Sequence, residues 1–147
     1  MAYQHIFVPV DGSETSFAAV KQAANFAKAF NAKVTVAQVL ALDPYIAAEY
    51  ISGDQTNEMI ERARRAIVES LAEAKQKFAD EGIEVETQLL EGQVIHREIV
   101  KAAQNSQADL IIIGSHGRTG LKKLFLGSVA QSVLSEGSTP VLVVRQP

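Results

Sequence analysis

The segment from Gly114 to Ser128 holds the residue types with the clearest chemical use in this sequence. Glycines at 114 and 117 allow backbone N–H groups to approach an anion without a Cβ in the way. Gly127 and Ser128 stand where a helix is expected to begin, and the free N–H groups and positive dipole end of a helix start favour negative charge. The Ser128 hydroxyl could cap that helix or donate to a phosphate oxygen. Three glycines, at 114, 117 and 120, and a helix-starting Gly-Ser pair in one loop therefore predict an anion site.

Familiar catalytic and nucleotide-binding motifs are missing from the chain. It has no Gly-x-x-x-x-Gly-Lys-Ser/Thr and no Gly-x-Gly-x-x-Gly after the first strand, which disfavours a motor-type NTPase and a dinucleotide oxidoreductase. It has no Gly-x-Ser-x-Gly, so a Ser-His-Asp hydrolase is disfavoured. Asp11 alone does not make a response-regulator phosphorylation site, because no acidic cluster accompanies it.

The three histidines are too far apart in sequence to suggest a metal site. We expect His5 to be structural and His96 to be exposed on a helix. Only His116, inside the glycine-rich loop, is expected near a ligand. No metal-binding residue is predicted.

The elements that must position this loop alternate between strand and helix signals, which is typical of a parallel sheet covered by helices on both faces. Ligands of such sheets bind beyond the carboxyl ends of the strands. Residues 41–54 are expected to form a long loop. The predicted strands are His5–Val10, Lys33–Leu40, Ile83–Leu89, Leu110–Ile113 and Val141–Val144, and the predicted helices run from the Ser13 cap to Asn31, from about Gln55 to Glu81, across Ile95–Ala103, and from Val129 to Leu134.

Composition excludes several classes of protein. The chain has no cysteine, so disulfides, thiolate catalysis and cysteine-bound metals are excluded. A net charge of −3 argues against nucleic-acid binding, and Arg62, Arg64 and Arg65 alternate with glutamates as on a solvated helix face. No apolar run is long enough to span a membrane. We expect a cytoplasmic protein of one domain, residues 1–147, because no linker or repeat divides the chain.

The glycine spacing resembles the ATP-binding signature of the universal stress protein family. Gly114 is followed after two residues by Gly117, and after nine more by Gly127 and Ser128. The segment 5–13 is similar to the family's first strand and turn, and 139–144 is similar to its ending, so the resemblance covers the whole chain. One departure is Val94, where the family often has proline at a helix start away from the loop.

The resemblance implies a fold and a set of site residues. The fold is a single-domain, open, doubly wound α/β sheet of five parallel strands in the order 3-2-1-4-5, of the adenine nucleotide alpha hydrolase-like type. Asp11 would hydrogen-bond the adenosine moiety. ATP is the implied ligand; a Mg²⁺ ion bridging its phosphates would be compatible, although no carboxylate pair marks a metal site. The base and ribose would be lined by Pro9, Val39 and Ile113, and the ribose and phosphates would be held by Gly114, His116, Gly117, Gly127, Ser128 and Val129.

Two functional hypotheses from different classes follow. The first is an ATP-binding regulatory module in stress response. The alternative is a slow ATPase or self-phosphorylating enzyme with Ser128 as a candidate acceptor, but no arginine finger or water-positioning residue is identified, so no catalytic residue is assigned. A homodimer is expected through Val141–Val144, because this wholly apolar strand would lie at a sheet edge in the implied order. The sequence does not identify protein partners.

Overall fold

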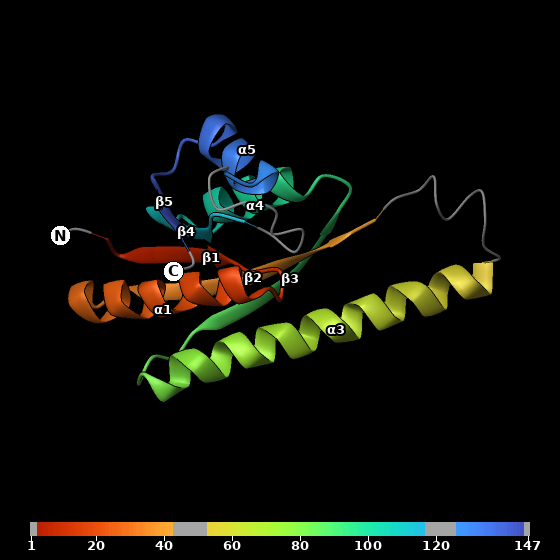
Figure 1. The fold of residues 1–147 in the computed structure, drawn as a ribbon, viewed down its shortest axis with the longest axis horizontal. Coiled ribbons are helices and arrows are strands. Elements are labelled where there is room, and N and C mark those ends of the chain that lie inside the picture. Colours follow the sequence, from red (N-terminus) through yellow and green to blue (C-terminus); the bar gives the residue numbers. More distant parts are fainter. Residues whose placement is uncertain (1–2, 43–52, 117–125, 146–147) are drawn as a thin grey trace.

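The computed structural model describes residues 3–42, 53–116 and 126–145, and it has the expected architecture. Five parallel strands form one sheet in the order β3-β2-β1-β4-β5. In Figure 1, α1 and α3 cover one face of this sheet, and α4 and α5 cover the other. The strands are β1 (His5–Pro9), β2 (Lys33–Ala41), β3 (Glu86–Gly92), β4 (Leu110–Gly114) and β5 (Val141–Val144), and the helices are α1 (Glu14–Phe30), α3 (Gly53–Asp80), α4 (Ile95–Asn105) and α5 (Ser128–Glu136).

Helix α1 begins and ends where its sequence predicts. Ser13 has an extended backbone, and its Oγ accepts a hydrogen bond from the Ser16 N–H at 3.2 Å. This bond satisfies one of the N–H groups that a helix start leaves without a partner. Asn31 follows the helix with φ 54°, a left-handed conformation that asparagine tolerates better than most residues.

The core lies on both faces of the sheet because the strands are apolar on both sides. In β1, Ile6 and Val8 pack in the cluster beneath α1 and α3, while Phe7 packs in the cluster beneath α4 and α5. All three side chains are fully buried. Every residue of β4 is buried as well, which confirms that its uninterrupted apolar run marks an interior strand.

The bounds of β3 differ from the prediction. The alternation that begins at Ile83 suggested a strand over 83–89, but the ladder with β2 begins at Glu86 and continues to Gly92. The Ile83 N–H instead donates to the Phe78 carbonyl at 2.9 Å and closes the end of α3. Ile83 and Val85 therefore alternate because they pack on the core, not because they pair with β2. The expected edge position of β3 is confirmed.

The strand order places a crevice beside β1. The chain leaves β1 for β2 and β3 on one side, and it returns to β4 and β5 on the other. In open α/β sheets, the carboxyl ends of strands at such a reversal form the usual ligand position. Most of the loop expected at 41–54 lies outside the described residues, and α3 begins at Gly53. Within the described ranges, no helix is both long and apolar enough to cross a membrane.

Candidate functional site

A cleft of about 510 Å³ lies at the carboxyl ends of β1, β2 and β4. This volume is within the range of small-molecule sites. The sequence-predicted residues come together here, with the exception of Gly117, which lies outside the described part of the chain. Those that line the cleft are Pro9, Asp11, Val39, Ile113, Gly114, His116, Gly127, Ser128 and Val129.

The turn after β1 holds Asp11 at the cleft. Its Oδ1 accepts a hydrogen bond from the Ser13 N–H at 2.9 Å. The Ser16 hydroxyl donates to the Ser13 carbonyl at 2.9 Å and lies 3.4 Å from the Asp11 N–H. The carboxyl group is thus positioned by the same residues that start α1. A carboxylate can accept several hydrogen bonds at once, so a ligand hydroxyl is compatible with this turn.

The start of α5 forms the opposite wall. The Gly127 N–H donates to the Ser115 carbonyl at 2.6 Å, which ties the helix start to the end of β4. Gly127 is the N-cap, and no side chain makes a capping hydrogen bond. Ser128 is the first helical residue, so the expectation that its hydroxyl could cap the helix is wrong. Its exposed side chain lines the cleft with the first turn, where the helix dipole favours an anion.

Gly114 is required by packing. A Cβ at this position would lie 2.9 Å from the Thr15 carbonyl oxygen and 3.0 Å from Thr15 Cγ2. The end of β4 therefore passes so close to the first turn of α1 that a larger residue does not fit without movement. Gly114 was expected to allow backbone contact with an anion, but its close packing on Thr15 requires a glycine here even without a ligand.

The histidines have distinct environments. His5 is structural as predicted, because Nδ1 lies 2.9 Å from the Ser106 carbonyl and Nε2 lies 2.7 Å from Thr35 Oγ1. His116 lies at the cleft, with Nδ1 3.0 Å from Ser115 Oγ. His96 was expected to be exposed, but its side chain is only 22% exposed and lies 2.5 Å from Glu136. This contact joins α4 to α5.

Helices α3 and α4 supply apolar walls that the sequence did not assign to a site. Ala63, Ala66 and Ile67 line the cleft from α3, and Ile95 and Ile99 line it from α4. Their helical spacing predicts a buried stripe, but spacing alone does not distinguish a residue in the core from one at the edge of a cleft. Ile95 illustrates the difference, because it was expected to face inward and is 37% exposed.

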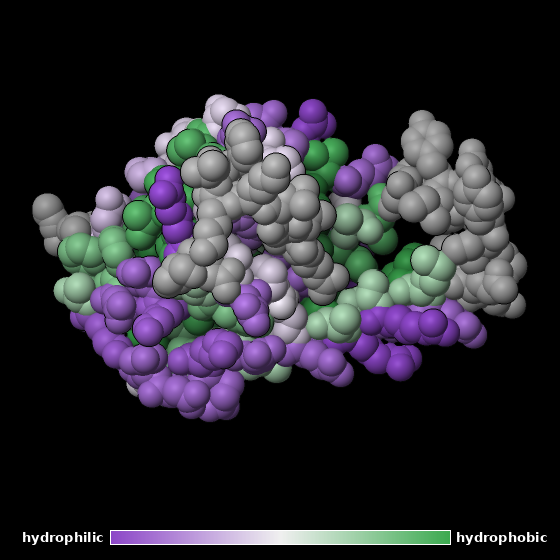
Figure 2. Space-filling model, viewed as in Figure 1, coloured by the Kyte–Doolittle hydropathy of each residue, from purple (hydrophilic) through white to green (hydrophobic). Residues whose placement is uncertain are grey.

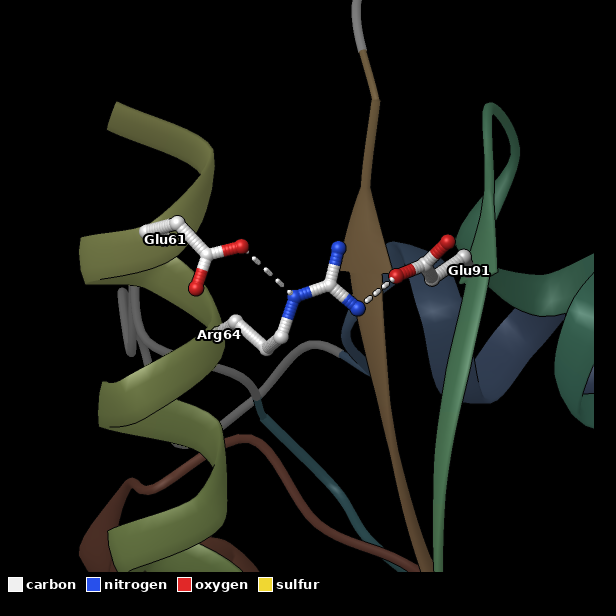
Figure 3. Close-up of polar contacts among 3 residues, drawn as sticks. All are labelled: Glu61, Arg64 and Glu91. Atoms are coloured by element: carbon white, nitrogen blue, oxygen red, sulfur yellow. Dashed lines mark hydrogen bonds and ion pairs between the residues drawn. The ribbon is translucent and has the colours of Figure 1, made fainter. Parts of the chain in front are cut away.

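The arginine cluster of α3 is not entirely a solvated face. Figure 3 shows Arg64 reaching from α3 to Glu91 on β3, where its guanidinium contacts the carboxylate. Its Nε also lies 3.5 Å from Glu61 Oε1. Arg62 and Arg65 are exposed as predicted. Arg64 therefore links α3 to the edge strand β3.

Gln38 is a polar residue of the cleft that the sequence did not assign to the site. It lies on β2, lines the cleft and is only 7% exposed. Its Oε1 is buried and has no hydrogen-bond partner among the described residues. The signal was visible as a glutamine in the otherwise apolar end of a predicted buried strand.

Metal chemistry has little support in the described part of the chain. Those residues bring together no group of three or more His, Asp or Glu side chains that could hold a metal ion. Asp11 is the one carboxylate among the described residues that line the cleft, so these residues offer no carboxylate pair to hold a Mg²⁺ ion.

The sequence matches known proteins over nearly its full length. The model of the universal stress protein family matches residues 2–145. Universal stress protein MJ0531 from Methanocaldococcus jannaschii is 38% identical over 146 residues, which cover 99% of this chain and 84% of that protein. The solved structure of MJ0577, from the same organism, has a TM-score of 0.86 at 32% identity and covers 100% of this chain and 99% of its own.

Two further solved structures contain nucleotides. A universal stress protein in complex with cAMP is 28% identical, with a TM-score of 0.74 and coverage of 98% of both chains. A universal stress protein from Archaeoglobus fulgidus in complex with dAMP is 26% identical, with a TM-score of 0.66 and coverage of 97% of this chain and 98% of that one. Both ligands are adenine nucleotides that differ in their sugar and phosphate groups.

Proposed function

The chain belongs to the universal stress protein family, and from this premise we propose that it is an ATP-binding regulatory protein of stress response. The observation that carries the proposal is the convergence of three kinds of group on one cleft. The uncapped start of α5 favours an anion, the Asp11 carboxyl accepts hydrogen bonds, and apolar side chains line the remainder. This combination fits the phosphates, ribose and base of a nucleotide.

The phosphates would lie at the first turn of α5. Backbone N–H groups and the positive end of the helix dipole attract them there. The exposed Ser128 hydroxyl makes no capping bond and can donate to a phosphate oxygen. Val129 and Ala130 complete this wall.

The nucleoside would lie across the strand ends. Asp11, at the end of β1, is placed to accept hydrogen bonds from ribose hydroxyls. Pro9, Val39 and Ile113 present apolar surface to the base. The complexes of related proteins with cAMP and dAMP support an adenine nucleotide, because adenine is what the two ligands share. Among adenine nucleotides, ATP is proposed because of the spacing of Gly114, Gly117 and Gly127.

A regulatory role is favoured over catalysis. The cleft has side chains that can hold a nucleotide, but its described residues include no cluster of carboxylates and no arginine or lysine. Fast phosphoryl transfer relies on groups that stabilise transferring charge and orient the attacking oxygen. Occupancy by ATP, rather than its turnover, is therefore the proposed signal.

The test begins with the purified protein. Denaturation followed by chromatography identifies any nucleotide that the protein carries, and calorimetric titration with ATP measures binding to the emptied protein. We expect ATP in the first experiment and saturable binding in the second. A wild-type protein that carries no nucleotide and takes up none at millimolar ATP would refute the proposal.

Ser128→Ala locates the site. The variant should bind ATP about tenfold more weakly, since it loses a hydrogen bond to a charged group. Its stability should be unchanged, because the hydroxyl does not cap α5. Ser135→Ala is the matched control. Ser135 lies on the same helix, is exposed, and donates only to the Ser132 carbonyl at 3.4 Å. Equal ATP affinity in both variants would place the phosphates elsewhere.

A further inference from the structure

The cleft reaches both faces of the sheet. Side chains alternate along a strand, and on β2 Val39 packs against the cluster beneath α4 and α5, whereas Leu40 packs in the cluster beneath α1 and α3. The nucleotide proposed above would meet the α4 and α5 face, through Val39 and Ile113. It leaves the opposite part of the cleft without a ligand. We call this part the α3 lobe, and it is lined by Val10, Gln38, Leu40, Ala63, Ala66 and Ile67.

Gln38 brings an unsatisfied hydrogen-bond acceptor to the α3 lobe. The alternation of β2 places it on the same face as Val36 and Leu40. It is only 7% exposed, and its Oε1 has no hydrogen-bond partner in the described part of the protein. Buried polar groups in native proteins are rarely left without a partner, and one that is needs an explanation. Because Gln38 also lines the cleft, a bound ligand can supply the missing donor.

The surroundings of this acceptor are apolar. In Figure 2, hydrophobic residues follow the upper edge of the N-terminal half of α3, while hydrophilic residues cover its lower edge. Among the described residues of β2 and α3 that line the cleft, none is charged. A charged ligand group would lose its hydration here without gaining an ionic partner, which is costly. The α3 lobe therefore suits a neutral molecule.

A single water molecule is a poor partner for Gln38. Buried waters usually make about three hydrogen bonds, and every other side chain of the α3 lobe is apolar. A molecule that combines an apolar body with one donor satisfies both the acceptor and the walls. A hydroxyl group on a hydrocarbon has this combination, because its O–H donates while the hydrocarbon packs against aliphatic side chains.

We propose that the α3 lobe is a second ligand site, which binds small neutral alcohols and phenols. The ligand hydroxyl donates a hydrogen bond to Gln38 Oε1, and the ring or alkyl body packs against Leu40, Ala63 and Ile67. The site does not depend on the proposed function, because it uses the opposite face of the sheet from the apolar residues assigned to the base.

The experiment removes the donor from the ligand and the acceptor from the protein in turn. The probes are phenol and toluene, which have similar size and differ by a methyl group in place of the hydroxyl. The proteins are the wild type, Gln38→Met and Gln88→Met, since methionine keeps the length of the side chain without its amide. Gln88, on the neighbouring strand β3, is the matched control because it does not line the cleft.

NMR titration of methyl-labelled protein gives both the position and the affinity of each probe. Phenol should shift the methyl signals of Leu40 and Ile67 in the α3 lobe more than those of Val39 and Ile113 on the other face. The wild type and Gln88→Met should prefer phenol to toluene by about tenfold, the effect of one hydrogen bond to a buried acceptor.

Gln38→Met should lose this preference, because the phenol hydroxyl would then be buried without an acceptor. A helical circular dichroism spectrum like that of the wild type shows that the variant is folded. Gln38→Leu repeats the measurement if the methionine variant does not fold.

Three outcomes would overturn the proposal. Neither probe causes a saturable shift in the wild type, or the shifts are confined to Val39 and Ile113, which places the probes on the nucleotide side. In the third, the preference for phenol persists in both Gln38 variants, so that another group accepts from the hydroxyl. A protein that binds phenol in the α3 lobe but takes up no ATP would refute the proposed function alone.

Discussion

Replacing Gly114 with alanine should destabilise the protein even when no ligand is present. The added Cβ would lie 2.9 Å from the Thr15 carbonyl oxygen, 3.0 Å from Thr15 Cγ2 and 3.1 Å from the Thr15 carbonyl carbon. Thr15 is buried in the first turn of α1, so the conflict involves backbone that cannot move aside alone. Overpacking of this kind costs about 1–3 kcal/mol. Alanine also lowers the conformational entropy of the unfolded chain, which stabilises the folded protein by up to about 1 kcal/mol. The expected net decrease in the free energy of unfolding is about 1–2 kcal/mol.

Urea unfolding of the ligand-free protein measures this loss. The protein has no tryptophan, so helical circular dichroism is the suitable signal. With a slope of about 2 kcal/mol per molar urea, the midpoint should fall by about 0.5–1 M. Gly92→Ala is the matched control, since the three atoms nearest to its Cβ would all belong to the Glu98 side chain, which can rotate away. A Gly114→Ala protein that unfolds at the wild-type midpoint would show that the close approach to Thr15 carries no energetic weight.

Three further predictions concern stability and assembly. Ser13→Ala should lower the free energy of unfolding by about 1 kcal/mol, because the Ser16 N–H loses its capping acceptor; an unchanged urea midpoint would contradict this. Glu91→Gln should cost less than about 1 kcal/mol, since the side chains of Arg64 and Glu91 are 40% and 39% exposed, and the cost should shrink further in 1 M salt. Light scattering should give twice the chain mass of 15.9 kDa, through pairing of Val141–Val144 at the edge of the sheet, and a monomer at micromolar concentration would exclude this dimer.

Much of the fold could be predicted because its signals are local. The apolar runs of β1 and β4 mark strands buried on both faces, and Ser13 and Asn31 mark the ends of α1. The bounds of a strand are harder to predict from the sequence, as Ile83 shows. Its side chain packs on the core with the alternation of a strand, while its N–H closes the preceding helix. Side-chain pattern reports burial, but only the backbone hydrogen bonds define where pairing begins.

Ser128 could cap α5 or contact a ligand, and a shift of one residue in the start of the helix decides between these two predictions. A helix that began one residue later would have made Ser128 the N-cap, with its hydroxyl occupied by a backbone N–H. The structure makes Gly127 the N-cap instead, with an extended backbone and an N–H bound to the Ser115 carbonyl. That bond joins two ends of a loop, and nothing in the residues near Ser128 specifies it. The sequence therefore places Ser128 near the cleft. It does not show that the Ser128 hydroxyl makes no capping bond and is available to a ligand.

The two ends of the cleft would recognise a ligand by different means. At α5, the groups available to phosphates are mostly backbone N–H groups, so the visible requirement in sequence is for glycines and a small first residue. At the strand ends, the base would meet apolar side chains such as Pro9, Val39 and Ile113, which resemble those of the core. A glycine pattern can therefore indicate that a phosphate binds, yet it carries no information on the base.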